Sequence, residues 1–191
     1  IVQYKGMSKQ LSDYRNLNGE ETYWIDNAFG GMPTYQLGAK YPADFLSPIY
    51  SFIRLIPRPA HILFLYLFSV YVFLTVLKLP WKYSVFGSLG FGFSTYLLII
   101  LQVGHNTKAL AIAFIPLVLS GIILIFRKKY LYGFILTTVF LAMQIRANHY
   151  QMTYYMMFLI GLLILYYFYH LIKEKKNNQL FICLTVYFFQ L

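Results

Sequence analysis

One tract near the N-terminus combines side chains that can bind or activate a polar substrate. Asp26 and Asn27 are followed by the paired glycines Gly30 and Gly31 and then by Pro33. Paired glycines let backbone N–H groups approach a ligand, and a carboxylate beside an amide suits a hydroxylated or phosphorylated substrate. A purely structural turn, capped by Asp26, is the alternative.

A second polar tract, Gly104-His105-Asn106-Thr107-Lys108, lies between two apolar runs. Lys108 can offer its charge to a lipid phosphate, with Asn106 and Thr107 as hydrogen-bond donors. His105 can bind phosphate or transfer a proton. An ordinary polar loop with one snorkelling lysine explains the same residues equally well.

Long polar side chains crowd a third tract, which contains Gln144, Arg146, Asn148, His149, Gln151 and Tyr154. At membrane depth such a density is costly unless the side chains face a wet cavity or a polar ligand. The guanidinium fork donates two parallel hydrogen bonds, so Arg146 is the stronger candidate for a pyrophosphate or lipid-phosphate clamp.

Metal and thiol chemistry have little support in the sequence. Neither a His-x-x-x-His spacing nor nearby paired carboxylates accompany the histidines, so we expect no protein metal site of the zinc type. His61 and His170 lie at the ends of apolar runs and are interpreted as interfacial residues. Cys183 is the single cysteine, which excludes a disulfide framework within the chain.

Long apolar segments must position these tracts. With 59% hydrophobic and 20% aromatic residues in 191, the chain has the composition of an integral membrane protein. We predict an all-α polytopic membrane protein with a helical bundle over residues 60–191. The expected spans cover about 60–77, 83–103, 109–126, 131–145 and 152–169, with a further one, 180–191, cut short. Gly87, Gly90 and Gly92 are assigned to close helix packing rather than to a nucleotide loop.

The gaps between the spans alternate in character. The basic gaps Lys78–Lys82, Arg127–Lys129 and Lys173–Lys176 hold half of the 16 lysines and arginines, and the two polar tracts separate them. Cytoplasmic loops carry such an excess of basic residues, so the polar tracts are expected outside. The net charge of +10 therefore reflects the expected orientation of the loops across the membrane, and we expect no nucleic acid partner.

Residues 1–59 are expected to form an extracytoplasmic loop segment. Their sequence predicts a short helix around Ser8–Leu17, turns at Asn18-Gly19 and Gly30-Gly31, and parts that lie along the membrane surface. Arg54 and Arg58, near the membrane entry, count against this orientation. Since no signal segment precedes these residues, we expect an internal fragment of a longer chain whose upstream span exported them.

Together these motifs resemble the YfhO-like family of bacterial multispanning membrane proteins, which resembles the GT-C class of glycosyltransferases. The resemblance rests on Gly30-Gly31-Met32-Pro33-Thr34-Tyr35, on Gly104–Lys108 and on Asn148-His149-Tyr150-Gln151-Met152-Thr153-Tyr154-Tyr155, in this order. It implies a GT-C-like helical bundle in the bacterial cytoplasmic membrane.

The resemblance also implies an activity. A polyprenyl-phosphate-linked sugar would be the donor, and an envelope glycopolymer or glycolipid on the outer face would be the acceptor. An acidic residue in the first exported loop would act as base or metal ligand. Asp26 is the first candidate, Asp13 and Glu20 are alternates, Asp44 is last, and the principal carboxylate can lie upstream of Ile1.

The remaining roles follow from the same resemblance. The lipid phosphate and substrate would be bound by His105, Asn106, Lys108, Arg146, Asn148, His149 and Gln151, while Gly30, Gly31 and Pro33 shape the loop. A divalent cation, Mg²⁺ or Mn²⁺, is compatible with this chemistry but is not required by it. A transporter or lipid flippase without glycosyl transfer is the rival class, because a polar cavity among membrane helices would serve it as well.

Overall fold

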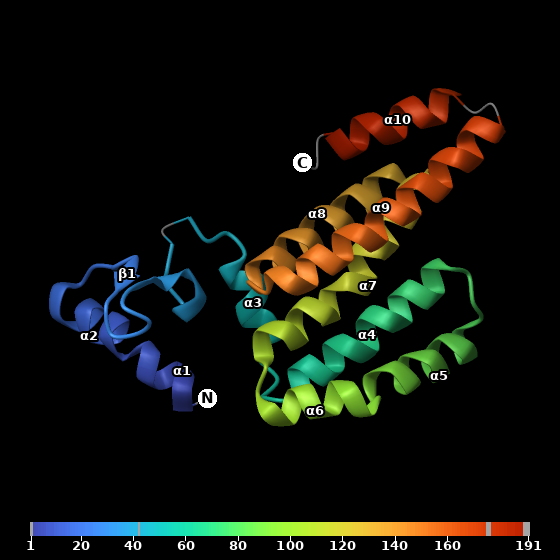
Figure 1. Ribbon diagram of the computed structural model, residues 1–191. Helices are drawn as coiled ribbons and strands as arrows, with labels where there is room; N and C mark the ends of the chain where they lie inside the picture. Colours follow the sequence, from blue (N-terminus) through green and yellow to red (C-terminus); the bar gives the residue numbers. More distant parts are fainter. Residues whose placement is uncertain (1, 42, 175–176, 189–191) are drawn as a thin grey trace. The chain divides into compact units, whose positions relative to one another are not determined.

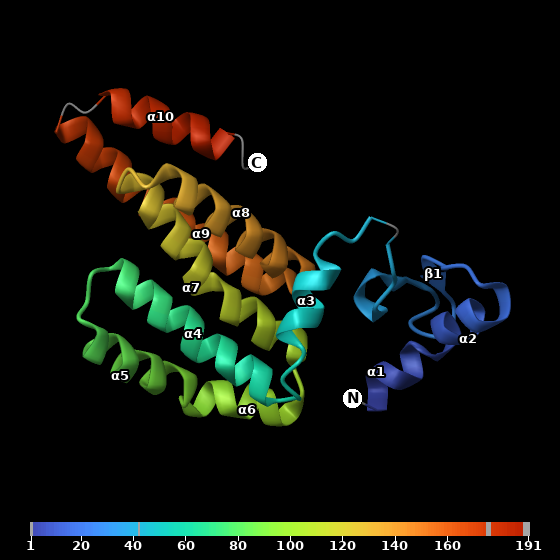
Figure 2. The same ribbon diagram turned by 180° about the vertical axis from the view of Figure 1, so that it is seen from behind.

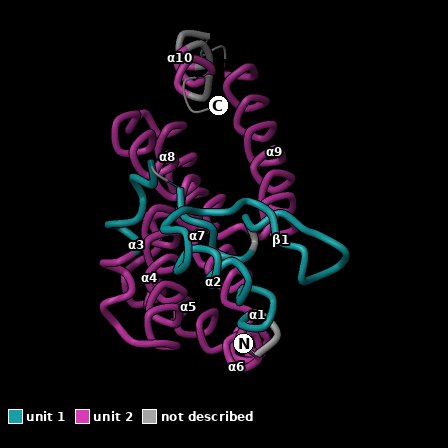
Figure 3. Tube along the Cα trace, turned by 90° about the vertical axis from the view of Figure 1, so that its left-hand side faces the viewer, with its two compact units in different colours: residues 1–50 teal, residues 51–191 magenta. Residues whose placement is uncertain are grey.

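The computed structural model describes residues 2–41, 43–174 and 177–188, and it is mostly helical (Figures 1 and 2). The chain divides into two compact units, Ile1–Tyr50 and Ser51–Leu191, which Figure 3 colours teal and magenta. The division falls earlier than residue 59, where the sequence analysis places the change from loop segment to bundle. Helix α3 (Ser47–Ile53) runs across it.

The first unit contains α1 (Val2–Met7), α2 (Lys9–Asn18), β1 (Trp24–Ile25), β2 (Met32–Pro33) and the 3₁₀ turn η1 (Thr34–Leu37). Helix α2 coincides with the predicted helix and ends at Gly19, whose left-handed φ of 71° closes it. The strands pair antiparallel, with Trp24 opposite Pro33. A small core forms where Leu11, Ile25 and Leu37 are buried together.

The second unit is a series of helices: α4 (Ala60–Val76), α5 (Trp81–Gly92), α6 (Thr95–Val103), α7 (Asn106–Phe126), α8 (Tyr130–Arg146), α9 (Tyr150–Lys173) and α10 (Asn177–Phe188). Helix α7 is the centre of this unit, because it is buried along nearly its whole length and packs against α4 and α8. Helix α8 returns antiparallel along α7, and α9 runs antiparallel to α8, in the same direction as α7 (Figure 1).

Among the residues that the structure describes, two helices, α7 and α9, are long and apolar enough to cross a membrane. The pair α5 and α6 counts as a third candidate if it is one broken span. The sequence analysis expects a single helix over 83–103, but the structure bends it by 47° at a short break. Ser94 is extended there, with φ −61° and ψ 139°, which ends the helical hydrogen bonding. Helices α4 and α8 are apolar but shorter.

Glycines allow α5 to lie close to α4. A Cβ on Gly87 would lie 2.6 Å from Leu74 Cδ1, and a Cβ on Gly92 would lie 2.6 Å from Leu67 Cδ2. Gly90 has open space instead. The predicted role in helix packing is therefore confirmed for two of these three glycines.

The antiparallel course of the helices separates the turns into two groups at opposite ends of this unit (Figures 1 and 2). We call one of them the basic end, and it carries the turns 77–80 and 127–129 and the last turn of α9. We call the other the polar end, and it carries the start of α4 and the turns 104–105 and 147–149. The two kinds of gap seen in the sequence thus lie at different ends.

Candidate functional site

The glycine tract of the first unit is a hairpin turn built around Trp24. The Trp24 indole Nε1–H donates to Asp26 Oδ1 at 2.9 Å. Gly30 and Gly31 have φ values of 72° and 118°, and a Cβ on Gly31 would lie 2.7 Å from the Trp24 ring. Both glycines are therefore required by the turn itself.

Helix α2 holds the same turn from the other side. Gln10 Oε1 accepts hydrogen bonds from the backbone N–H groups of Asp26 at 2.9 Å and Asn27 at 3.0 Å. The Asn27 amide donates to the Met7 carbonyl at 3.3 Å. These bonds support the structural alternative for this tract, while the exposed Asp26 carboxylate still faces solvent.

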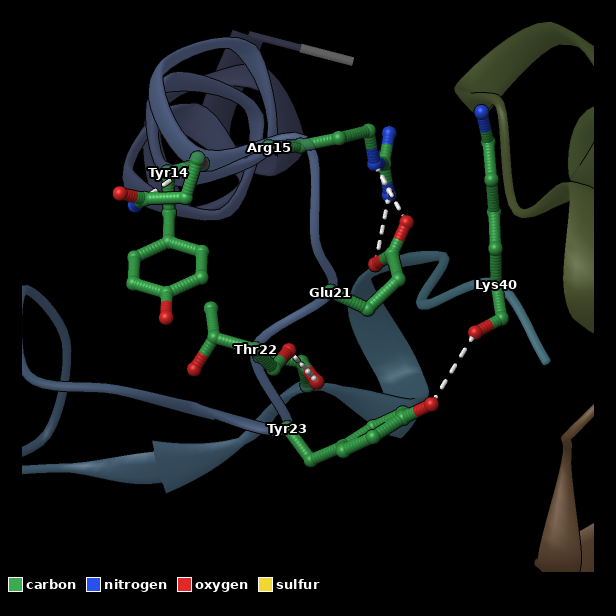
Figure 4. Close-up of polar contacts among 8 residues, drawn as sticks. Tyr14, Arg15, Glu21, Thr22, Tyr23 and Lys40 are labelled. Carbon is green, nitrogen blue, oxygen red and sulfur yellow. Dashed lines mark hydrogen bonds and ion pairs between the residues drawn. The ribbon is translucent and has the colours of Figure 1, made fainter. Parts of the chain in front are cut away.

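The other carboxylates of this unit lie in different surroundings. Glu21, which the sequence analysis does not select, accepts two hydrogen bonds from Arg15, at 2.5 and 3.0 Å (Figure 4). This hydrogen bonding lowers the pKa of the Glu21 carboxyl below its ordinary value.

Asp13 lines a shallow hollow of about 390 Å³, and Glu20 is exposed. Within the described ranges, no three His, Cys, Asp or Glu side chains cluster as metal ligands.

At the polar end of the second unit, the turn before α7 presents the predicted phosphate-binding residues. His105 immediately precedes α7, and Asn106 is its first residue. The Lys108 Nζ lies over the Tyr96 ring, 5.4 Å from its centroid, so a cation–π contact directs the ammonium group.

The turn between α8 and α9 supplies the remaining predicted residues. Arg146 ends α8, and Asn148 adopts the left-handed conformation with φ 58°, which asparagine tolerates. His149 is partly buried just before α9. Gln151 donates to the Tyr155 hydroxyl at 2.9 Å, so its amide is engaged along the exposed face of α9.

The turns before α7 and before α9 lie at the same end of the second unit (Figures 1 and 2). Burial lowers the pKa of His149, and the nearby positive charges of Lys108 and His105 lower it further. The structure therefore brings His105, Lys108 and His149 into one neighbourhood, with Arg146 and Asn148 in the same turn as His149. Asp26 belongs to the other compact unit.

Several buried polar atoms at or near the polar end lack a partner within the described part of the chain. They include His149 Nδ1 and Gln144 Nε2, and Gln144 is fully buried, with only its Oε1 bonded, to the Thr153 hydroxyl at 3.2 Å. A buried polar group without a protein partner is costly, so these atoms are suited to contact with a polar ligand or an ordered water.

His61 and Tyr66 were missed as parts of this region. His61 is 2% exposed rather than interfacial, and its Nδ1 and the Tyr66 hydroxyl are unpaired within the described residues. The buried residues of α4 recur at helical spacing, as His61-Leu65-Ser69 and Ile62-Tyr66-Val70. The sequence of α4 is apolar on all sides and gives no signal for which face is buried, so the burial of both polar side chains follows from the packing alone.

No protein-family model, curated protein or solved structure matches the chain. The resemblance to YfhO-like proteins stays a prediction from the sequence motifs.

Proposed function

We propose that this chain is part of a bacterial membrane glycosyltransferase of the cytoplasmic membrane. It would bind a polyprenyl-phosphate-linked sugar at the polar end of the second unit and transfer the sugar to an envelope glycopolymer or glycolipid. The observation that carries the proposal is that the turns bearing His105, Lys108 and His149 lie at the same end of the second unit, opposite the basic turns (Figures 1 and 2).

The membrane orientation follows from the two ends. Helices α7 and α9 have the length and apolarity of spans, and the basic end carries the residues that favour the cytoplasmic side. The polar end then lies at the outer face, where a lipid-linked sugar donor and an envelope acceptor both meet the bilayer surface. Residues 1–59 would be extracytoplasmic in the same topology.

The polar end has the groups that an anionic leaving group needs. Lys108 and Arg146 would hold the lipid phosphate and stabilise the charge that develops on its oxygen as the bond to the sugar breaks. The unpaired Gln144 Nε2 and His149 Nδ1 would find hydrogen-bond partners in the bound donor.

Transfer also needs a base that takes the proton of the acceptor hydroxyl. A carboxylate would do this, with Asp26 as the first candidate and Asp13 and Glu20 as alternates. Asp26 is exposed and accepts one hydrogen bond, from Trp24, which leaves its other oxygen for a hydroxyl or for a divalent cation such as Mg²⁺ or Mn²⁺.

The test uses purified full-length protein with a labelled polyprenyl-phosphate sugar and an envelope acceptor extract. We expect Lys108→Ala and Arg146→Ala each to lower turnover by about 100-fold, the size of loss seen when one transition-state hydrogen-bond donor is removed. Lys82→Ala, which removes a charge at the basic end, should leave turnover unchanged. Unchanged turnover in both polar-end variants would remove these residues from the mechanism.

A flippase or transporter is the second candidate, and the bend between α5 and α6 favours it. Interrupted helices line the substrate sites of many transporters, because their free backbone groups bind ions and polar substrates. Vesicles with the labelled donor on one side distinguish the candidates. Transferred sugar supports the transferase, whereas intact donor on the opposite leaflet supports the flippase.

A further inference from the structure

Besides the hollow beside Asp13 in the first unit, a cavity lies at the basic end of the second unit, at the opposite end of the helices from the polar turns. It has a volume of about 690 Å³, which is within the range of small-ligand sites. Its polar rim comprises Lys78, Arg127, Lys128 and Lys129, which come from the turns after α4 and α7. Its wall includes Tyr166 and Tyr167 of α9.

The rim is positively charged and partly fixed. The Arg127 guanidinium donates to the Val76 carbonyl, which ties the turn after α7 to the end of α4. The side chains of Lys78, Lys128 and Lys129 are exposed and make no hydrogen bond or ion pair with any residue that the structure describes. Three ammonium groups are therefore available around one opening.

The backbone at two of these lysines is unfavourable for a side chain. Lys78 and Lys128 have φ values of 68° and 64°. Each occupies the left-handed position of the same helix-ending motif, in which the next N–H bonds back over a full turn, Leu79 to Leu74 and Lys129 to Leu124. The equivalent position after α6, at the polar end, is Gly104.

Glycine is the residue that this conformation favours, so the two lysines are not explained by folding. Strained residues that persist at one place in a structure point to a functional requirement. Positive charge at this end also favours the cytoplasmic side, and at these two positions it lines one cavity.

The wall has the character of a lipid contact. The rings of Phe126 and Tyr167 stack with centroids 4.4 Å apart, and Leu171 is buried beside them. Tyrosines favour the depth of lipid head groups, where an apolar ring and a polar hydroxyl are both satisfied. A cationic rim above an aromatic and aliphatic wall fits an anionic head group attached to acyl chains.

We propose that this cavity binds the phosphodiester head group of an anionic glycerophospholipid of the cytoplasmic leaflet. The proposal rests on the membrane insertion that the proposed function includes, but not on sugar transfer. Glu174 also lines the cavity and opposes anions of either kind. The aromatic and aliphatic wall beside the cationic rim favours a membrane lipid over free phosphate, because inorganic phosphate has no apolar part to contact that wall.

The test measures binding of short-chain phosphatidylglycerol to the detergent-solubilised full-length protein, and the melting temperature of each variant. The double variant Lys78→Gly with Lys128→Gly removes both charges while giving the backbone its preferred residue. We expect about 30-fold weaker binding, from about 1 kcal/mol per lysine at the membrane surface, with an equal or higher melting temperature.

Matched controls distinguish binding in this cavity from nonspecific attraction of the lipid to basic residues at the same end. Lys82→Ala removes a basic residue at the same end that does not line the cavity, and it should leave the affinity unchanged. Phosphatidylcholine should not bind to the parent protein, and millimolar inorganic phosphate should not displace phosphatidylglycerol. Parental affinity in the glycine double variant, an equal loss in Lys82→Ala, or displacement by phosphate would each overturn the proposal. Because sugar transfer is not measured, its failure would leave this result intact.

Discussion

At both ends of the helical unit, helices end in a residue with the left-handed backbone conformation, but the residue types differ between the two ends. At the polar end, helices finish at Gly104 and Asn148, both of which tolerate the left-handed conformation. At the basic end, they finish at Lys78 and Lys128, which do not favour it. The turn geometry after α4, α6 and α7 is the same, so the difference lies in side-chain chemistry. The basic end carries charge where folding alone would select glycine.

The largest expected effect on stability comes from the close contact between α7 and α8, the helices that run between the two ends. Gly121 of α7 lies against α8, where a Cβ would meet the Thr137 backbone nitrogen at 2.6 Å and the Gly133 carbonyl oxygen at 2.9 Å. Gly121→Ala must push the helices apart and should destabilise the protein by about 1–3 kcal/mol. Chemical unfolding of the purified protein measures this.

The control for this substitution is Gly161→Ala in α9, where a Cβ meets nothing within 4 Å. Alanine suits a helix interior better than glycine, so this variant should gain about 0.5–1 kcal/mol. Equal stability of the two variants would contradict the close α7–α8 contact, and the comparison of the two ends depends on that contact.

An intermediate effect on stability is expected when the residues in the left-handed conformation are exchanged at the two ends. Lys128→Gly should stabilise the protein by about 1 kcal/mol, because it relieves the left-handed strain. Gly104→Ala should destabilise it by a similar amount, about 1 kcal/mol, because it introduces the same strain at the polar end. Opposite shifts in the unfolding midpoint are the expected result. Shifts of the same sign would show that backbone strain does not distinguish the ends.

The smallest effect is a dependence on pH at the polar end. Burial, followed by the charges of Lys108 and His105, lowers the folded-state pKa of His149 below 6.5. The unfolded chain then takes up a proton at higher pH than the folded chain does. The stability that neutral His149 contributes is therefore complete above about pH 6.5 and is lost as the pH falls through the folded pKa.

Melting curves from about pH 8 to about pH 5 test this dependence. The parent should lose more stability over this range than His149→Gln, by a difference in Tm on the order of 1–2 °C. His170→Gln changes an exposed histidine at the basic end and should behave as the parent does. Parallel curves for the parent and His149→Gln would contradict the buried, charge-surrounded environment of His149.

The sequence predicts much of the helical framework because long apolar runs and punctuating polar tracts are local signals. Helices cover most of the expected ranges, although positions 189–191 of the last one lie outside the described residues, and Gly19 ends α2 where its turn chemistry indicates. The bend within 83–103 escapes such reasoning, because nothing in an apolar glycine-containing run distinguishes one long helix from two short ones.

The candidate site is harder to predict from sequence. The polar tracts identify His105, Lys108, Arg146 and His149, but their proximity depends on how α6 to α9 pack. The role of Gly31 under the Trp24 ring depends likewise on a contact between side chain and backbone. His61 is a further case, because α4 is apolar on all sides and its sequence does not indicate which face packs inside.

The orientation of the two ends is the central claim, and site-directed labelling in intact bacteria tests it most directly. Thr107→Cys and Lys129→Cys place thiols at exposed positions of the polar and basic ends, in a Cys183→Ser background that removes the buried native thiol. A membrane-impermeant maleimide should label position 107 in intact cells and position 129 only after permeabilisation. Labelling of both positions from the same side, or the reverse pattern, would contradict the account.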